Sequence, residues 1–187
     1  MGAIEKPIRA DVRRNRERLL AAAHDLFAEE GTDVSREAVA KRAGVGIGTV
    51  YRHFPTHDAL VEAVYRNEVA QLCDAAEALL RDHAPDAALE AWMDRFVDYL
   101  AAKRGMSDAL QSAFGSGSEV FADTRRQILG ALASVLEAGA AAGTIRADVD
   151  AEDVLGAMSG IWRISDPERA RRALMLVMDG LRYRPSG

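Results

Sequence analysis

The chain has 187 residues and a formal net charge of −5, and it is 49% hydrophobic, 28% charged and 6% aromatic. This length allows one or two domains with a packed core. Its single cysteine, Cys73, excludes an intrachain disulfide, and no apolar run approaches the roughly 18 residues that a transmembrane helix requires. No charged segment followed by an apolar segment opens the chain, so we expect a soluble cytoplasmic protein without a membrane partner.

The charge is distributed unevenly along the chain. Residues 1–66 hold 11 Lys and Arg against 10 Asp and Glu, which gives +1, and the remainder carries −6. Attraction to DNA phosphates depends on local charge, because salt screens charges over about 8 Å. The overall acidity therefore does not exclude a DNA-binding protein.

The composition predicts an all-α fold. Ala, Leu, Arg and Glu, which favour helices, are abundant, and apolar residues nowhere alternate with period two over more than a few positions. Residues 1–10 lack helical periodicity, so we expect an arm without regular structure there. The first helix is predicted over residues 11–30, with Gly31 ending it. Its apolar stripe consists of Leu19, Ala23, Leu26 and Phe27.

A helix, a glycine turn and a second short helix are predicted over residues 35–54, SREAVAKRAGVGIGTVYRHF. Ser35 can accept from the free N–H groups that open the first of these helices, and Gly44 can end it. Val50 and Phe54 are four residues apart and form the inner face of the second helix. Two helices joined by a glycine-containing turn are a known way of presenting a helix to the DNA major groove.

These residues resemble the TetR family of one-component transcriptional regulators. Residues 40–45 read A-K-R-A-G-V, residues 48–54 read G-T-V-Y-R-H-F, and Leu60 opens the next helix, so the resemblance covers roughly residues 11–66. It implies an N-terminal helix-turn-helix domain over 11–66 and a ligand-binding and dimerisation domain over 67–187, with about nine helices. It also implies a homodimer, most often a repressor, that binds a palindromic double-stranded DNA operator and is released by a small-molecule effector.

The resemblance and the side-chain chemistry together predict the DNA contacts. Gly46 and Gly48 can present backbone N–H groups to the duplex, and Arg52 can reach phosphate or guanine. Gly46 and His57 depart from the residues typical of the family, which predicts fewer side-chain contacts than a typical relative makes. The alternative is that Tyr51 and Arg52 simply cover the surface of a small helical domain. The predicted DNA-binding residues are Ser35, Gly46, Ile47, Gly48, Thr49, Tyr51, Arg52, His53 and His57.

Arg13 and Arg14 on the first helix are also predicted to contact DNA, by neutralising phosphate or entering the minor groove. A solvated helix face with Glu17 as partner explains them equally well, and the sequence leaves both explanations open. His53 and His57 have the spacing of a helical metal pair, but Pro55 interrupts the helix between them. We therefore predict no metal site, and the chain carries no motif for a cofactor.

The C-terminal helices follow from their apolar spacing and capping residues. Thr56 can cap a fourth helix, and further helices are predicted from Asp86 to Gly105, over 107–114, from Ser118 to about Ala142, and after Asp150 and Asp166. Large apolar side chains concentrate there, and by resemblance they line a cavity for a largely apolar ligand, with ordinary core packing as the alternative. The predicted ligand-binding residues are Trp92, Met93, Phe96, Tyr99, Phe114, Phe121, Met158 and Trp162.

The last two helices have wide apolar faces with several small residues. By resemblance, each subunit contributes these helices to a four-helix dimer interface, and burial within the monomer is the alternative. The predicted interface residues are Leu155, Ile161, Ala170, Leu174, Val177, Met178 and Leu181.

Two other functions are alternatives to a DNA-binding regulator. A helical-bundle enzyme or small-molecule carrier with a vestigial helix-turn-helix is disfavoured, because no catalytic triad, phosphate loop or paired carboxylates opposite a histidine stand out in the C-terminal half. A nucleoid-type DNA binder without an effector would not require so large a second domain. We therefore expect no catalytic residues.

Overall fold

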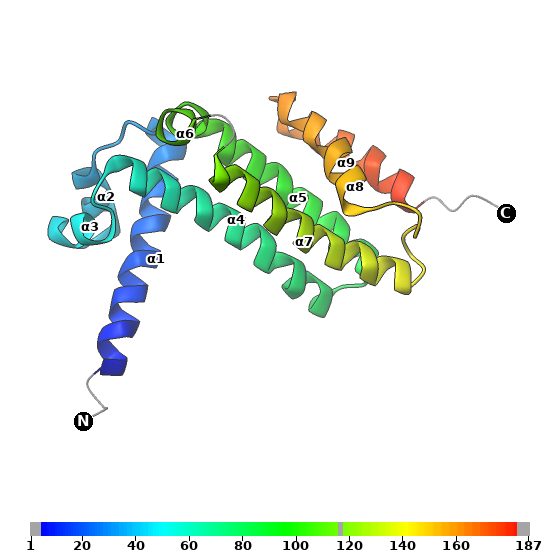
Figure 1. The fold of residues 1–187 in the computed structure, drawn as a ribbon, viewed down its shortest axis with the longest axis horizontal. Helices are drawn as coiled ribbons and strands as arrows, with labels where there is room; N and C mark the ends of the chain where they lie inside the picture. Colours follow the sequence, from blue (N-terminus) through cyan, green and yellow to red (C-terminus); the bar gives the residue numbers. More distant parts are fainter. Residues whose placement is uncertain (1–4, 116–117, 183–187) are drawn as a thin grey trace. The chain divides into compact units, whose positions relative to one another are not determined.

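A computed structural model of the chain describes residues 5–115 and 118–182, apart from the side chains of residues 5–10 and of Trp162. The described residues form nine α-helices and one short 3-10 helix, with no strand (Figure 1). This confirms the predicted all-α fold. None of the described helices has both the length and the apolarity needed to cross a membrane.

The helices are distributed over two compact units, residues 1–67 with 102–116 and residues 68–101 with 117–187. The first unit contains α1 (Glu5–Glu30), α2 (Arg36–Ala43), α3 (Ile47–His53), the beginning of α4 (His57–Asp82) and α6 (Ser107–Phe114). The second contains the rest of α4, most of α5 (Pro85–Gly105), α7 (Glu119–Ala141), α8 (Ala151–Ser159), the 3-10 helix η1 (Gly160–Arg163) and α9 (Pro167–Arg182).

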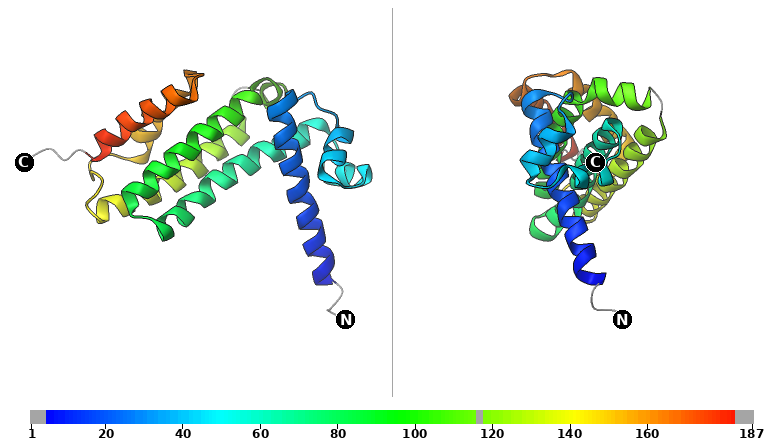
Figure 2. Two further views of the ribbon diagram at one scale, coloured as in Figure 1. Left: turned by 180° about the vertical axis from the view of Figure 1, so that it is seen from behind. Right: turned by 90° about the vertical axis from the view of Figure 1, so that its left-hand side faces the viewer.

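The core of the first unit forms where α1 packs against α2 and α3. Leu19, Val39 and Val50 have no exposed surface, and Phe54 is 2% exposed. Leu19, Val50 and Phe54 are residues whose inward position was predicted, and burial of these apolar side chains with Val39 orients the two short helices on α1. The views in Figure 2 show α2 and α3 beside the C-terminal half of α1.

Local capping residues fix ends of α2, α4 and α8. Ser35 Oγ accepts from the backbone N–H of Ala38 at 3.1 Å, and Gly44 ends α2 with φ of 63°. Thr56 Oγ1 accepts from the backbone N–H of Ala59 at 3.0 Å at the start of α4. The carboxylate of Asp150 accepts from the N–H of Asp153 at 2.9 Å, as predicted for the start of α8. These bonds satisfy N–H groups that a helix start otherwise leaves unpaired.

The second unit has α4, α5 and α7 running side by side, with α8 and α9 against them (Figures 1 and 2). Trp92 on α5 is fully buried, and its indole N–H donates to the carbonyl of Leu72 on α4 at 2.9 Å. The Phe96 ring stacks on Trp92 with centroids 5.9 Å apart. This paired indole nitrogen allows a large aromatic side chain to be buried without an unsatisfied donor.

Three helix boundaries differ from the prediction. α1 begins at Glu5 instead of near Asp11, because Pro7 lies in its first turn, where the missing N–H costs nothing. α5 begins at Pro85, so Asp86 is not its cap; proline is favourable as a first helical residue. α8 stops at Ser159, and the chain continues as the 3-10 helix η1.

Six of the seven predicted interface residues on α8, η1 and α9 are buried within the chain. Leu155, Ile161, Ala170, Leu174, Met178 and Leu181 are each at most 5% exposed within a single chain, and Val177 is partly exposed. Burial within the monomer, the alternative left open by the sequence, therefore accounts for six of the seven. These six side chains already pack against their own chain.

Candidate nucleic-acid interface

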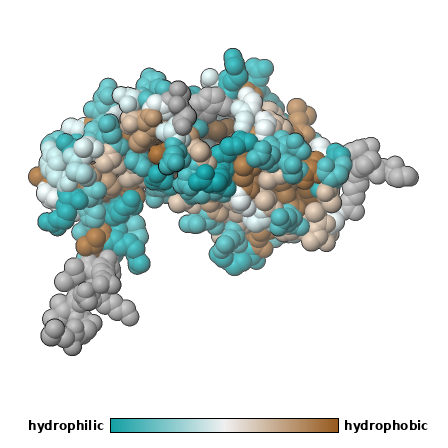
Figure 3. Space-filling model, in the orientation of Figure 1, coloured by the Kyte–Doolittle hydropathy of each residue, from teal (hydrophilic) through white to brown (hydrophobic). Residues whose placement is uncertain are grey.

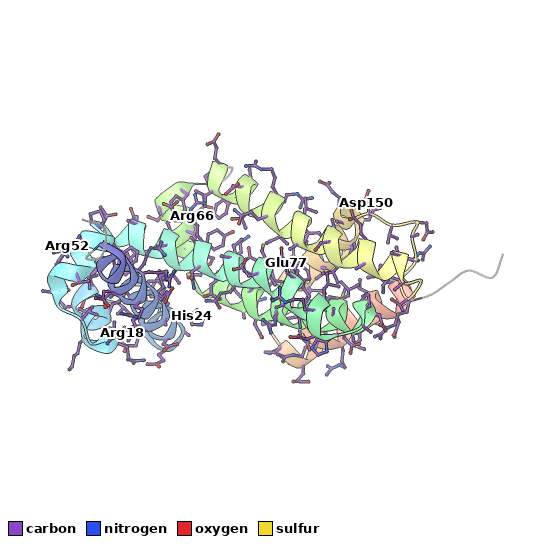
Figure 4. The ribbon with its side chains drawn as sticks, turned by 90° about the horizontal axis from the view of Figure 1, so that it is seen from below. Arg18, His24, Arg52, Arg66, Glu77 and Asp150 are labelled. Carbon is purple, nitrogen blue, oxygen red and sulfur yellow. The ribbon has the colours of Figure 1, made fainter. Side chains whose placement is uncertain are left out.

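The short helix α3 has one buried face and one exposed face. Val50 is fully buried, whereas Ile47 and Tyr51, four residues apart, are 39% and 43% exposed. Gly48 and Arg52, the next pair at the same spacing, are also exposed. Figure 4 labels Arg52 on α3 and Arg18 on α1. The structure thus gathers four of the predicted DNA-binding residues on one outward face.

The two glycines of this surface are not required by contacts within the protein. A Cβ built at Gly46 or Gly48 would meet no atom within 4 Å. Gly46 is the N-cap of α3 in an extended conformation and offers no side chain to cap the helix. In the first turn the N–H of Thr49 donates to the carbonyl of Gly46 at 2.8 Å, whereas a helix start supplies no acceptor for the N–H groups of Ile47 and Gly48, so these two can bond an incoming phosphate or base.

Tyr51 is held by two neighbours on α2. Its hydroxyl donates to Glu37 Oε1 at 2.8 Å, and the Arg36 guanidinium carbon lies 4.3 Å from the ring centroid. The Glu37 bond raises the pKa of the Tyr51 phenol. The pKa of Glu37 is lowered, first by a hydrogen bond from its own backbone and then by the Tyr51 hydroxyl. The tyrosine is therefore oriented before DNA arrives.

Three arginine side chains bond the helix-turn-helix motif to its surroundings or to itself. Arg18 on α1 donates to the carbonyls of Ala43 and Gly44 at 2.5 and 3.4 Å, where α2 ends. Arg36 donates to the carbonyls of Phe54 and Pro55 beyond α3. Arg42 makes a bidentate pair with Glu29, at 3.1 and 2.7 Å.

Sequence reasoning did not single out Arg18, Arg36, Glu37 or Arg42. A general rule could have pointed to arginines such as Arg18 and Arg36, because carbonyls at helix ends lack intrahelical partners and attract cationic donors. Which arginine reaches which helix end depends on how the helices cross, and the sequence does not contain that information locally.

The other predicted DNA-binding residues lie around this face. Ser35 is exposed but uses its hydroxyl oxygen as the α2 cap, while Thr49 is half-buried. His53 is half-buried, and its pKa is lowered by burial and then by the positive charges of Arg16 and Arg52. His57 is half-buried with its ring 6.3 Å from that of Phe27. Both imidazoles therefore contact protein as well as solvent.

The two N-terminal arginines have acidic neighbours on their own helix. Arg13 lies 3.6 Å from Glu17, and Arg14 pairs with Asp11. Both arginines remain largely exposed, with side chains 76% and 65% accessible. Exposed pairs of this kind are worth less than about 1 kcal/mol, so DNA phosphate can displace the acidic partner.

The residues predicted to bind an effector are divided between the two units. Trp92, Met93, Phe96, Tyr99 and Met158 are buried in the second unit. Phe114 belongs to the first unit and Phe121 to the second, both partly exposed, and the side chain of Trp162 lies outside the described residues. Tyr99 lines a pocket of about 330 Å³ between α4 and α5, and Met93 lines another of about 180 Å³ between α5 and α9.

Family comparisons agree with this architecture. Residues 19–64 match the model of bacterial regulatory proteins of the tetR family, and residues 84–183 match that of the C-terminal domain of SbtR-like transcriptional regulators. A solved TetR transcriptional regulator from Streptomyces coelicolor is 48% identical, covering 89% of this chain and 98% of that chain with a TM-score of 0.81. The chain belongs to the TetR family of transcriptional regulators. It is therefore a DNA-binding regulator with an N-terminal helix-turn-helix, as the sequence motif predicted.

Two further relatives show how the similarity is distributed. A TetR transcription regulatory protein from Mycobacterium vanbaalenii is 40% identical over 95% of this chain and 100% of that chain, with a TM-score of 0.78. An HTH-type transcriptional regulator of Staphylococcus aureus (strain USA300) is 40% identical over 63 residues, which is 33% of this chain and 34% of that protein. The TetR family is one of transcriptional regulators and not of enzymes.

Proposed function

We propose that this TetR-family protein is a homodimeric repressor that binds a palindromic operator and is released by a small, largely apolar effector. Residues 11–66 form its DNA-binding domain and residues 67–187 its effector-binding and dimerisation domain. The observation that carries the proposal is the exposed face of α3, with Ile47, Tyr51 and Arg52 presented above the buried Val50. Such a helix fits the major groove.

In this proposal, the residues of the α3 face have different tasks on DNA. Ile47 makes apolar contact with a thymine methyl, while the N–H groups near Gly46 and Gly48 approach the backbone closely. Tyr51 donates to a phosphate, and Arg52 reads a guanine edge or binds phosphate. Ser35, Thr49, His53, His57, Arg13 and Arg14 remain candidate flanking contacts.

The proposed effector site lies in the second unit, next to the aromatic row of α5. Trp92, Phe96 and Tyr99 follow each other along that helix, with neighbouring centroids 5.9 and 5.8 Å apart. An apolar ligand that enters among them separates these rings and shifts the population of conformations toward one that does not fit the operator. Met158 on α8, which is buried in the same unit, completes the proposed site.

The proposed dimer contact is made by α8 and α9, with their outward faces meeting the partner and the buried residues of the predicted interface supporting them from within. Leu176 is 74% exposed and Met175 is 40% exposed on α9, and Gly156, Ala157 and Gly160 are exposed near α8. Figure 3 shows apolar surface among hydrophilic side chains where α9 lies. Small residues beside exposed apolar ones allow close packing of helices from two subunits.

The function is tested by selecting DNA from random sequence with the whole protein and measuring affinity for the selected duplex by fluorescence anisotropy. Affinity is expected to fall steeply with salt, and a palindromic consensus is expected. A flat salt response or the absence of enrichment would refute the DNA-binding assignment.

The role of Arg52 is tested with Arg52→Ala on the selected duplex and on single-base variants of it. If Arg52 reads a base, its removal should cost about 1–3 kcal/mol of binding free energy and relax specificity at one position. If it contacts phosphate, its removal should weaken binding to all duplex variants equally. The matched control is Arg66→Ala, which removes an equal charge from the first unit at a residue that is ion-paired with Glu62. Equal losses for both variants would remove Arg52 from the proposed interface.

A further inference from the structure

The hydroxyl of Tyr51 already has an anionic partner in the free protein. It donates to Glu37 Oε1 at 2.8 Å, across 14 residues of sequence and from α3 to α2. Glu37 is exposed, and so is Tyr51. The partner therefore stands on the same surface that is proposed to face DNA.

A tyrosine hydroxyl has one proton to donate. The same hydroxyl cannot donate to the Glu37 carboxylate and to a DNA phosphate at once. An ionised carboxylate offers only acceptors, and the lowered pKa of Glu37 keeps it ionised at neutral pH. A phosphate that takes over the Tyr51 proton consequently leaves the two anions close together, where they repel each other.

The neighbouring Arg36 does not remove this conflict. Its guanidinium lies over the Tyr51 ring and donates to the backbone carbonyls of Phe54 and Pro55, so it is anchored to the end of α3. It holds the ring in place whether or not the hydroxyl stays with Glu37. The change on DNA binding is therefore confined to the acceptor of one hydrogen bond.

We propose that Glu37 is an affinity-limiting residue of the DNA interface, because its carboxylate competes with the DNA phosphate for the Tyr51 hydroxyl. This inference rests on the proposed contact between Tyr51 and phosphate. This competition lowers the affinity for every DNA sequence, since phosphates carry no sequence information. Glu37 thereby weakens binding to non-specific DNA and leaves occupancy to depend more on the base contacts of α3.

The test compares Glu37→Gln with the wild-type protein on two fluorescein-labelled duplexes, one of mixed sequence and one selected from random sequence. The side-chain amide that Glu37→Gln introduces can donate its N–H to the tyrosine oxygen, which frees the tyrosine proton for phosphate. We expect about threefold to tenfold tighter binding to both duplexes. The matched control Glu30→Gln removes one exposed charge from the end of α1 and should change affinity by less than about twofold.

A second background separates hydroxyl competition from a general charge effect. Tyr51→Phe keeps the ring beneath Arg36 and removes only the hydroxyl, so Glu37→Gln should gain less than about twofold in that background. An equal gain in both backgrounds, or no gain from Glu37→Gln, would each overturn the inference while DNA binding itself stands. Failure of the wild-type protein to bind either duplex would overturn the proposed function as well. Circular-dichroism melting of each variant verifies that the fold is kept.

Discussion

At the scale of single residues, several arginines of the first unit bond groups within that unit. Arg18 and Arg36 donate to backbone carbonyls, and Arg42 is paired with Glu29. These guanidinium groups stabilise helix ends and the contact between α1 and α2. These three side chains are thus already engaged within the unit, so the proposed DNA contact depends more on Arg52 and on the backbone of α3.

Arg18 is the residue whose removal should affect the helix-turn-helix most directly. Arg18→Met keeps the apolar stem and removes the bonds to the carbonyls of Ala43 and Gly44, which should cost about 1–2 kcal/mol of stability. DNA affinity should fall with it, because the turn between α2 and α3 loses its anchor. Thermal melting and fluorescence anisotropy measure the two effects.

Arg13→Met serves as the matched control for Arg18→Met. Arg13 lies on the same helix, is largely exposed and contacts only its neighbour Glu17 among the pairs described above, so its stability change should stay within about 0.5 kcal/mol. Equal destabilisation by the two variants would mean that the contact of Arg18 with the end of α2 adds nothing.

At the scale of elements, the sequence predicted what depends on neighbouring residues. The caps at Ser35, Gly44 and Asp150 are bonds over three or four residues, and the structure confirms them. The sequence did not distinguish the inward from the outward face of α9, because Leu174 and Leu176 are both apolar and only the packing of α9 on the second unit separates them. The same reason explains why Arg18 and Glu37 were missed.

Two glycines on α7 allow a sharp test of packing. A Cβ at Gly139 would lie 2.5 Å from Ile145 Cγ1 and 2.9 Å from its Cβ, whereas one at Gly130 would meet nothing within 4 Å. Gly139→Ala should therefore destabilise the protein by about 1–3 kcal/mol through overpacking. Gly130→Ala should instead stabilise it by about 0.5–1 kcal/mol, because alanine favours a helix. Thermal or urea unfolding of the two variants should show shifts of opposite sign; shifts of the same sign would contradict the packing at Gly139.

At the scale of the whole molecule, charge and function are divided along the chain. Residues 1–66 are close to neutral and the remainder carries −6, so phosphate repulsion would keep the acidic helices away from DNA. Symmetric pairing through the acidic part places two recognition helices for a palindrome, which is how the proposed dimer would operate.

The revised interface predicts the effect of Leu176→Arg. A charge at this exposed position should convert the proposed dimer to monomers without unfolding it, and it should weaken operator binding. Leu174→Arg is unsuitable for this purpose, since Leu174 is 3% exposed and the variant would damage the core. Sedimentation velocity measures the mass, and Ala70→Arg, at an exposed site on α4, is the control. A monomeric wild-type protein, or an unchanged mass for Leu176→Arg, would exclude the α9 contact.

The two motif helices are too short to be stable alone, so the DNA-binding surface forms only when α1 is folded. α2 has 8 residues and α3 has 7, and isolated helices shorter than about 12–15 residues are marginal in water. Their structure depends on Leu19 and Arg18 of α1, which supply the buried surface and the donor at the end of α2. The exposed face of α3 thus depends on residues 18–54 together and not on the motif alone, and any local unfolding that frees α1 removes this face in one step.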